Sequence, residues 1–288
     1  MPAAARSLLL TDAYRARIVE LRRRASGLVA ASWTLDVDDL DASFLAWLAR
    51  SDLIVTAAQA EIARLSDVYV AAYIGSELDA TVAPMGLDTG AYAGTTLDGR
   101  PVRSILSPSL FTVKRGLADG RSFAEASKLG QARALRNATT EVDGAGDRAL
   151  DDLLEQRYEI RGWRRVASGG ACGACLGLMT GAIQTTARVL HRHPHCRCTK
   201  EPVVDGAGDP VQRKTGADLF AAMSPEEQNR LFAGRGGEAK AELIRSGKVE
   251  LGDLVQETRF SLEGSKGGRF NRADVIITET PLARLLSD

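Results

Sequence analysis

All cysteines and histidines of this 288-residue chain lie in one short segment, residues 171–198. The segment holds four cysteines and three histidines, and it begins with a Cys-x2-Cys pair, Cys172 and Cys175. Further candidate ligands follow about twenty residues later: His193, Cys196 and Cys198. Structural zinc takes four thiolate or imidazole ligands at spacings of this kind. The segment therefore predicts a structural Zn²⁺ site that links two separate stretches of chain.

Five candidate ligands compete for the four positions around the ion. Cys196 and Cys198 are two residues apart, so in an extended segment their side chains point to opposite faces. This favours a set of three thiolates and one imidazole from Cys172, Cys175, His193 and Cys196, with Cys198 packing beside the site or substituting. A sharp turn at Arg197 would instead allow four thiolates. A disulfide or buried thiols are the alternatives to metal, and His191 and His195 are expected at the surface or beside the ligands.

The residues around the Cys-x2-Cys pair, GGACGACLGLMTG, are too rich in glycine to suggest a hydrophobic core, so we expect the metal to replace one. Residues 161–200 also hold seven Arg and Lys and no Asp or Glu. A metal-linked basic module could face phosphate groups or an acidic protein surface. An unengaged basic patch is the alternative.

Charge is distributed unevenly along a chain whose formal net charge is zero. The net charge is +4 over residues 1–35, −9 over 36–98, +8 over 99–200 and −3 over 201–288. Such blocks predict surfaces for different neighbours, or else ordinary solvated helix faces. Aromatic residues make up only 5% of the chain, which favours close-packed helices over an aromatic-rich β sandwich.

The N-terminal residues do not form the apolar run of a signal peptide. No stretch approaches the roughly 20 apolar residues that a membrane span requires. We therefore expect a soluble protein made in the cytoplasm, without membrane contact, and in that compartment clustered cysteines favour metal binding over disulfides.

Hydrophobic periodicity predicts a helix over residues 12–26, with Gly27 as the stop, and either one long helix or two collinear helices over residues 39–78. Pro84 and the glycines that follow it break the pattern. Ser107-Pro108 marks another helix start, and a capping box of Ser122 with Glu125 marks a third. We expect this third helix to be interrupted at Gly144–Gly146.

The remainder of the chain predicts shorter elements. We expect a small strand that leads into a turn within residues 161–178, a linker over 201–216, two short helices after the capping box at Ser224, and a β hairpin within 257–280. The expected fold class is α+β and mainly helical, in three parts: an elongated helical N-terminal arm (1–98), a central small α+β zinc-knuckle module (99–200), and C-terminal helices with a hairpin (201–288).

The sequence lacks the motifs of several common enzyme classes. It has no His-Glu-x-x-His, no Gly-x-Ser-x-Gly and no phosphate-binding loop, and residues 161–200 offer no carboxylate for Mg²⁺. We therefore expect a protein that is not an enzyme. A metal-dependent nuclease that uses His191 or His195 and a zinc-bearing nucleic-acid-binding module are the alternatives.

The order of three motifs, RALRNATTE, then RGWRRVASGGACGACLGL, then HPHCRC, resembles the tailed-phage head morphogenesis family, the Mu F-like minor capsid proteins. The likeness covers about residues 105–200 and is most specific at its ending. The matching positions are Arg136, Thr140, Glu141, Trp163, Cys172, Cys175, His193, Pro194, Cys196, Arg197 and Cys198.

The resemblance implies a minor structural protein of a phage head, present in few copies near the portal. Its implied partners are the portal and major capsid proteins, and its implied task is procapsid assembly and DNA packaging or ejection. Packaged DNA could meet the basic residues 161–200. The implied location is the virion, in the head interior or at the portal vertex, after assembly in the host bacterial cytoplasm.

Overall fold

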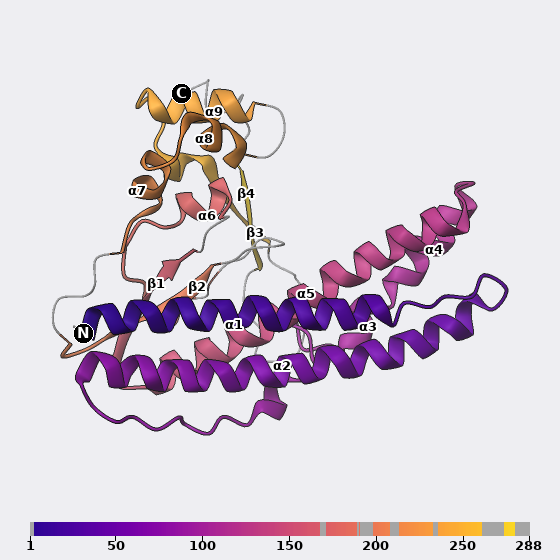
Figure 1. The fold of residues 1–288 in the computed structure, drawn as a ribbon, viewed down its shortest axis with the longest axis horizontal. Helices are drawn as coiled ribbons and strands as arrows, with labels where there is room; N and C mark the ends of the chain where they lie inside the picture. Colours follow the sequence, from indigo (N-terminus) through magenta and orange to yellow (C-terminus); the bar gives the residue numbers. More distant parts are fainter. Residues whose placement is uncertain are drawn as a thin grey trace. The chain divides into compact units, whose positions relative to one another are not determined.

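A computed structural model describes residues 3–167, 171–188, 190, 198–207, 213–232, 236–260 and 274–279. It is mainly helical, with two antiparallel strand pairs in the described ranges, which confirms the expected fold class at this level (Figure 1). The chain divides into two compact units, Met1–Arg157 and Tyr158–Asp288. The boundaries expected after residues 98 and 200 do not coincide with this division.

Unit 1 is built from helices of very different lengths. Its elements are α1 (Ala3–Ala31), α2 (Leu40–Leu78), the 3-10 helix η1 (Thr89–Tyr92), α3 (Val102–Leu106), α4 (Pro108–Ala118) and α5 (Phe123–Gln156). The helical prediction over residues 39–78 is confirmed by α2, which is one continuous helix and not two collinear ones. By contrast, α1 starts before residue 12 and continues through Gly27, so the predicted stop is wrong. Buried Ala25 and Val29 flank this glycine and hold the helix on the core.

The core of unit 1 lies between α1, α2 and α5, which contact one another pairwise. Trp33, Phe44 and Trp47 form an aromatic cluster at one end of the α1–α2 pair, with Trp33 and Trp47 ring centroids 4.6 Å apart at 78°. Further along the pair, Tyr14 and Tyr69 stack with their ring centroids 4.2 Å apart. These contacts fix the register of α1 on α2.

The predicted interruption of the third helix at Gly144–Gly146 is wrong, because α5 runs unbroken from Phe123 to Gln156. The two glycines are sites of close packing. A Cβ atom on Gly144 would lie 2.7 Å from the Leu97 side chain, and one on Gly146 would lie 2.9 Å from Ile62. The cost of glycine in a helix, about 1 kcal/mol each, is offset here by the close approach of neighbouring side chains.

Unit 2 contains shorter elements. They are β1 (Ile160–Val166), α6 (Gly173–Gly177), β2 (Thr199–Val204), α7 (Gly216–Ala221), α8 (Pro225–Leu231), α9 (Gly237–Arg245), the 3-10 helix η2 (Leu251–Leu254), β3 (Val255–Phe260) and β4 (Asp274–Glu279). The predicted strand, the capping box at Ser224 and the C-terminal hairpin are confirmed. The predicted linker over 201–216 is wrong at its start, because residues through Val204 pair with β1.

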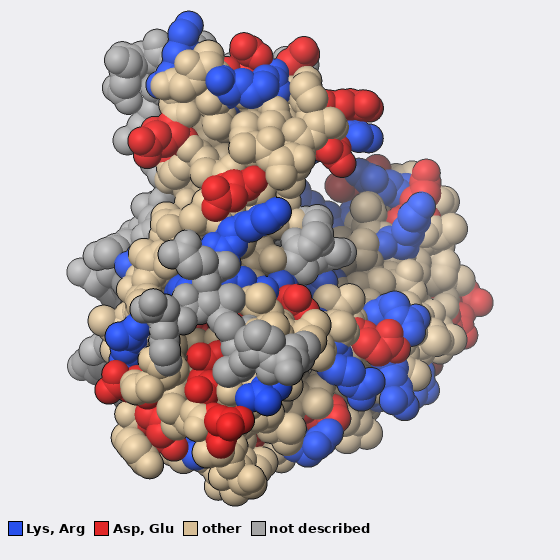
Figure 2. All heavy atoms as spheres, turned by 60° about the vertical axis from the view of Figure 1, so that its left-hand side comes forward, with Lys and Arg blue, Asp and Glu red and all other residues tan. Residues whose placement is uncertain are grey.

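Within the described ranges, no helix has both the length and the apolar character that a membrane span requires. On the face of the molecule in Figure 2, acidic and basic side chains lie interspersed. The alternating charge blocks of the sequence therefore do not appear as separate single-sign patches on this face.

Candidate metal centre

Two strands provide the frame for the predicted metal site in unit 2. β1 and β2 are antiparallel, and their register runs from Ile160 opposite Val204 to Val166 opposite Thr199. On the other edge of β1, Trp163 and Gln184 exchange two backbone hydrogen bonds of 2.9 and 2.7 Å. Gly162 permits this approach, since a Cβ atom there would lie 2.3 Å from the Gln184 carbonyl oxygen.

Three of the five predicted ligands gather at the end of this strand pair. Cys198 directly precedes β2, Cys172 is the N-cap residue of α6, and Cys175 lies within α6. Cys175 and Cys198 are each 1% exposed and share one cluster, with Cys172, Ala167 and Ala171 packed against it. The fold thus brings two stretches of chain together through their cysteines.

The remaining predicted ligands, His193 and Cys196, lie outside the described residues, as do His191 and His195. Although the three cysteines share a cluster, no group of three or more His, Cys, Asp or Glu side chains in the described ranges is arranged to hold a metal ion. The Zn²⁺ site therefore stays a prediction. In such a site the described cysteines would supply sulfur ligands, and a further ligand would come from the segment 191–197.

A hydrophobic core covers α6, which differs from the expectation that metal would replace such a core. Leu176 and Met179 pack with residues from the C-terminal helices: Phe220, Phe232, Ala241, Leu251 and Leu254. Glycines make this packing possible, since a Cβ atom on Gly216 would lie 1.8 Å from the Leu176 carbonyl oxygen. The residues after position 200 therefore form one unit with the Cys-x2-Cys segment.

Lys200, one of the seven bases in residues 161–200, is fully buried in β2. Its Nζ lies 4.5 Å from the centre of the Trp163 ring and donates a hydrogen bond of 3.0 Å to the Arg188 carbonyl. Trp163 Nε1 donates to the same carbonyl at 3.0 Å. The Lys200 charge is thus used inside the fold, in a cation–π contact that holds the segment before β2.

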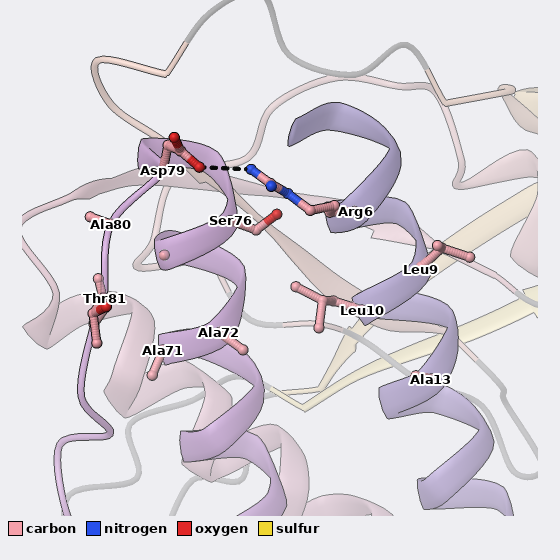
Figure 3. Close-up of a pocket in the computed structure, with 12 residues that line it drawn as sticks. Arg6, Leu9, Leu10, Ala13, Ala71, Ala72, Ser76, Asp79, Ala80 and Thr81 are labelled. Atoms are coloured by element: carbon pink, nitrogen blue, oxygen red, sulfur yellow. Dashed lines mark hydrogen bonds and ion pairs between the residues drawn. The ribbon is translucent and has the colours of Figure 1, made fainter. Parts of the chain in front are cut away.

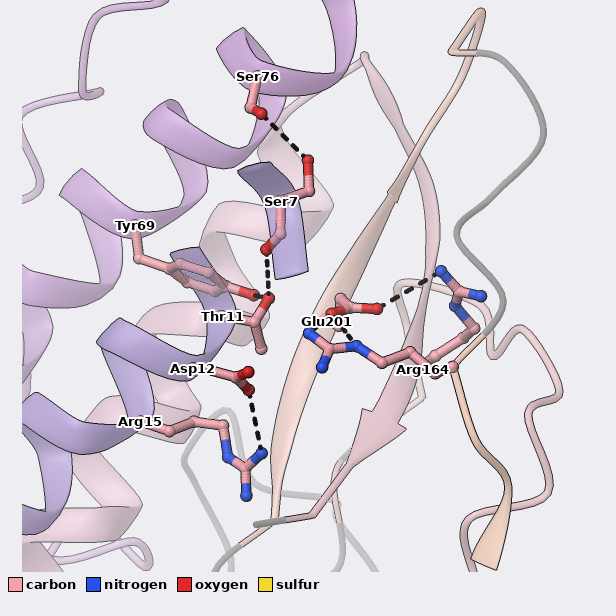
Figure 4. A network of polar contacts seen from close by, with 9 residues as sticks. Ser7, Thr11, Asp12, Arg15, Tyr69, Ser76, Arg164 and Glu201 are labelled. Carbon is pink, nitrogen blue, oxygen red and sulfur yellow. Dashed lines mark hydrogen bonds and ion pairs between the residues drawn. The ribbon is translucent and has the colours of Figure 1, made fainter. Parts of the chain in front are cut away.

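Arg164 is also used internally. It lies directly opposite Glu201 in the β1–β2 register, and Figure 4 shows its guanidinium reaching the Glu201 carboxylate, with Nη2 3.4 Å from Oε1. Arg213 Nε donates to the other oxygen of Glu201 at 2.8 Å. Glu201 is fully buried. It directly follows the segment 161–200, which contains no acidic residue. Sequence reasoning missed this carboxylate.

In unit 1, the helical residues that carry the family resemblance lie on α5. Arg136 and Thr140 are exposed, whereas Glu141 is 6% exposed and accepts a hydrogen bond of 3.1 Å from the Leu97 backbone N–H. Gln59 Nε2 donates to the backbone carbonyls of Glu141 and Thr95. Burial raises the pKa of the Glu141 carboxyl to about 7. These contacts give Glu141 a structural role, which is to fasten the segment around Leu97 to α5.

A groove of about 830 Å³ lies between the start of α1 and the end of α2 (Figure 3). Arg6 and Asp79 form an ion pair of 3.0 Å across one end. Apart from this pair, the lining is mostly alanine, leucine and other apolar residues. The Ser76 hydroxyl, which also lines the groove, is hydrogen bonded to the Ser7 hydroxyl at 3.2 Å. The groove thus offers an apolar surface rather than the paired acid and base groups that catalysis uses.

In the comparisons with known proteins, no family model, no curated protein and no solved structure matches this chain.

Proposed function

We propose that the chain is a minor capsid protein of a tailed-phage head, which acts near the portal in procapsid assembly and DNA packaging or ejection. The role is structural and not catalytic. One observation supports it above the others: Cys172, Cys175 and Cys198, three positions of the resembling motif, pack together although they come from two separate segments. In this proposal unit 2 is a zinc-linked module presented by a helical unit 1.

The donor chemistry of the cluster fits Zn²⁺. Cysteine thiolates are soft ligands, and zinc in structural sites commonly combines three Cys with one His, or four Cys. The burial of Cys198 beside Cys175 favours Cys198 as the third ligand, in place of the Cys196 that extended geometry favoured from the sequence. His193 or Cys196 would complete the site.

Bound zinc would add a cross-link to a module that already has a hydrophobic core. The ion would join α6 to the start of β2, and the chain of residues 178–197 between them would become a closed loop. Such a loop keeps a fixed surface next to the strand pair, which suits a protein that docks on a large assembly. Metal binding and folding are coupled in sites of this type, so removal of the metal is expected to loosen the loop.

Co-sedimentation tests the proposed role. Purified full-length protein would be mixed with portal protein and with procapsids of the same phage, and pelleted fractions compared. We expect the wild-type chain to pellet with one or both, and the Cys172→Ser variant to pellet less because the docking surface is no longer held. Leu53→Ala serves as the control substitution, since Leu53 is 72% exposed on α2. A wild-type chain that remains in the supernatant with both partners would contradict the proposal.

A further inference from the structure

The first half of α5 packs against α4 to form a two-helix hairpin with an excess of positive charge. Residues 102–139 hold seven Arg and Lys but only two acids, Asp119 and Glu125, in a chain whose net charge is zero. Glu125 is held in the capping box of α5 by Ser122. Arg164 and Lys200, two bases of the 99–200 block that belong to unit 2, are buried and therefore contribute little to the exposed charge.

Three of the seven bases make contacts within unit 1. Arg103 pairs with Asp52 at 3.0 Å, Lys114 pairs with Asp41 at 2.6 Å, and Arg133 Nη1 donates to Thr112 Oγ1 at 3.1 Å. The other four are exposed and form no ion pair with the described residues; they are Arg115, Arg121, Lys128 and Arg136. This second group is exposed to an anionic partner, and within it Arg121 also interacts electrostatically with Glu125.

The packing of the hairpin brings two of these bases, Arg115 and Arg136, to one side. Gly116 and Gly130 let the two helices approach, since Cβ atoms there would lie 2.9 Å from Ala126 and 2.4 Å from Val113. The Arg133–Thr112 hydrogen bond crosses between the helices on one side of this seam. Arg115 lies three residues after Thr112 and Arg136 three residues after Arg133, so both flank the same side.

We propose that the α4–α5 hairpin binds the phosphate backbone of duplex DNA through Arg115, Arg121, Lys128 and Arg136. Long basic side chains on two packed helices can contact successive phosphates without reading base sequence. Docking of a protein would favour a contiguous apolar centre. Among its described residues the hairpin exposes two large apolar side chains, Phe111 and Leu129, against four exposed bases, so its exposed chemistry suits an anion better. This inference stands on the charge and packing of unit 1 and does not depend on the proposed virion role.

Fluorescence anisotropy with a short labelled duplex tests the inference on the full-length chain. With four phosphate contacts, the plot of log K against log salt concentration is expected to fall with a slope of about −3.6 between about 50 and 200 mM NaCl. The double variant Arg115→Gln/Arg136→Gln should reduce the magnitude of that slope by about 2 and weaken binding more than tenfold at about 50 mM NaCl. Circular dichroism would verify that both proteins are folded.

Two exposed arginines on α1 supply a matched control. The variant Arg17→Gln/Arg24→Gln removes the same charge from the same unit, and we expect it to keep the wild-type slope to within about 0.5. Equal weakening by the control would overturn the hairpin as the site. Undetectable duplex binding at low salt, tighter binding of single-stranded DNA of equal length, or equal binding of polyglutamate would overturn duplex DNA as the partner. None of these outcomes bears on co-sedimentation with portal or procapsid.

Discussion

The two units of this protein reach a packed interior by different means. Unit 1 buries the faces of long helices against one another, with an aromatic cluster and stacked tyrosines between α1 and α2. Unit 2 has short elements that pack through glycine contacts, a buried charge network around Glu201 and a cysteine cluster. Glycines allow close approaches in both units, so the comparison teaches that unit 1 adds aromatic and aliphatic volume between long helices, whereas unit 2 adds a buried charge network and a cysteine cluster.

The largest expected effect is the loss of stability when the Trp47 side chain of unit 1 is removed. Trp47 is fully buried, contacts the rings of Trp33 and Phe44, and donates through Nε1 to the Val29 carbonyl at 3.3 Å. Trp47→Ala removes these contacts and leaves a cavity, so we expect a loss of about 4 kcal/mol in the free energy of unfolding. Denaturant titration measures it, with exposed Leu53→Ala as the control. A loss below about 1 kcal/mol would mean that volume does not govern unit 1.

The matching change in unit 2 adds a single methyl group. Gly216→Ala places a Cβ atom against the Leu176 carbonyl oxygen, so α7 and α6 must separate, and we expect a loss of about 3 kcal/mol. Gly252→Ala is the matched control, because a Cβ atom there meets nothing within 4 Å. Hydrogen exchange of peptides from residues 171–188 and 213–232 reports the change directly. Equal stability and equal exchange in the two variants would show that unit 2 does not depend on the close approach at Gly216.

Unit 1 contains a buried carboxyl group, Glu141, as unit 2 contains Glu201. Burial raises the pKa of Glu141 to about 7 from an ordinary value of 4.5, so between these pH values the folded chain keeps a proton that the unfolded chain has lost. Stability gained from this group is therefore present below pH 4.5 and is lost as the pH rises through 7, by about 3 kcal/mol in total.

The variant Glu141→Gln should abolish this pH dependence, because the amide stays neutral and can still accept from the Leu97 N–H. Urea titrations at pH 5 and pH 8 would show a smaller difference for the variant than for the wild type. An unchanged difference would show that Glu141 is not the group responsible.

The smallest expected effect concerns the start of α5. Ser122 and Glu125 form a reciprocal capping box, so Ser122→Ala should cost about 1 kcal/mol. Ser107 precedes α4 without a side-chain cap hydrogen bond, and Ser107→Ala is expected to cost less. Thermal melts of the two variants give the comparison, and a reversed order would contradict it.

Much of unit 1 could be predicted because its signals are local. The apolar spacing of residues 40–78 and the capping box at Ser122 correspond to helices in the structure. At Gly27 and at Gly144–Gly146 helix propensity is outweighed by tertiary contacts, which are made by the neighbouring Ala25 and Val29 in the first case and by the glycines themselves in the second. No local pattern reports the side chain that will lie over a glycine.

The candidate site in unit 2 was predictable in its residue types but not in its surroundings. Cysteine spacing gave five candidate ligands and favoured Cys196 over Cys198, whereas the fold brings Cys198 together with Cys172 and Cys175. The sequence could not reveal that Glu201 opposes Arg164 or that Leu176 joins a core with Phe220, since both depend on long-range register and packing. Strand pairing of this kind leaves only a weak trace in a single sequence.

Zinc content of the purified full-length protein, measured by elemental analysis, tests most directly whether a metal ion cross-links unit 2. We predict one zinc per wild-type chain, its loss in Cys198→Ser, and its loss in only one of the two variants His193→Asn and Cys196→Ser. A folded wild-type chain without zinc, or a Cys198→Ser variant that keeps its zinc, would contradict this account.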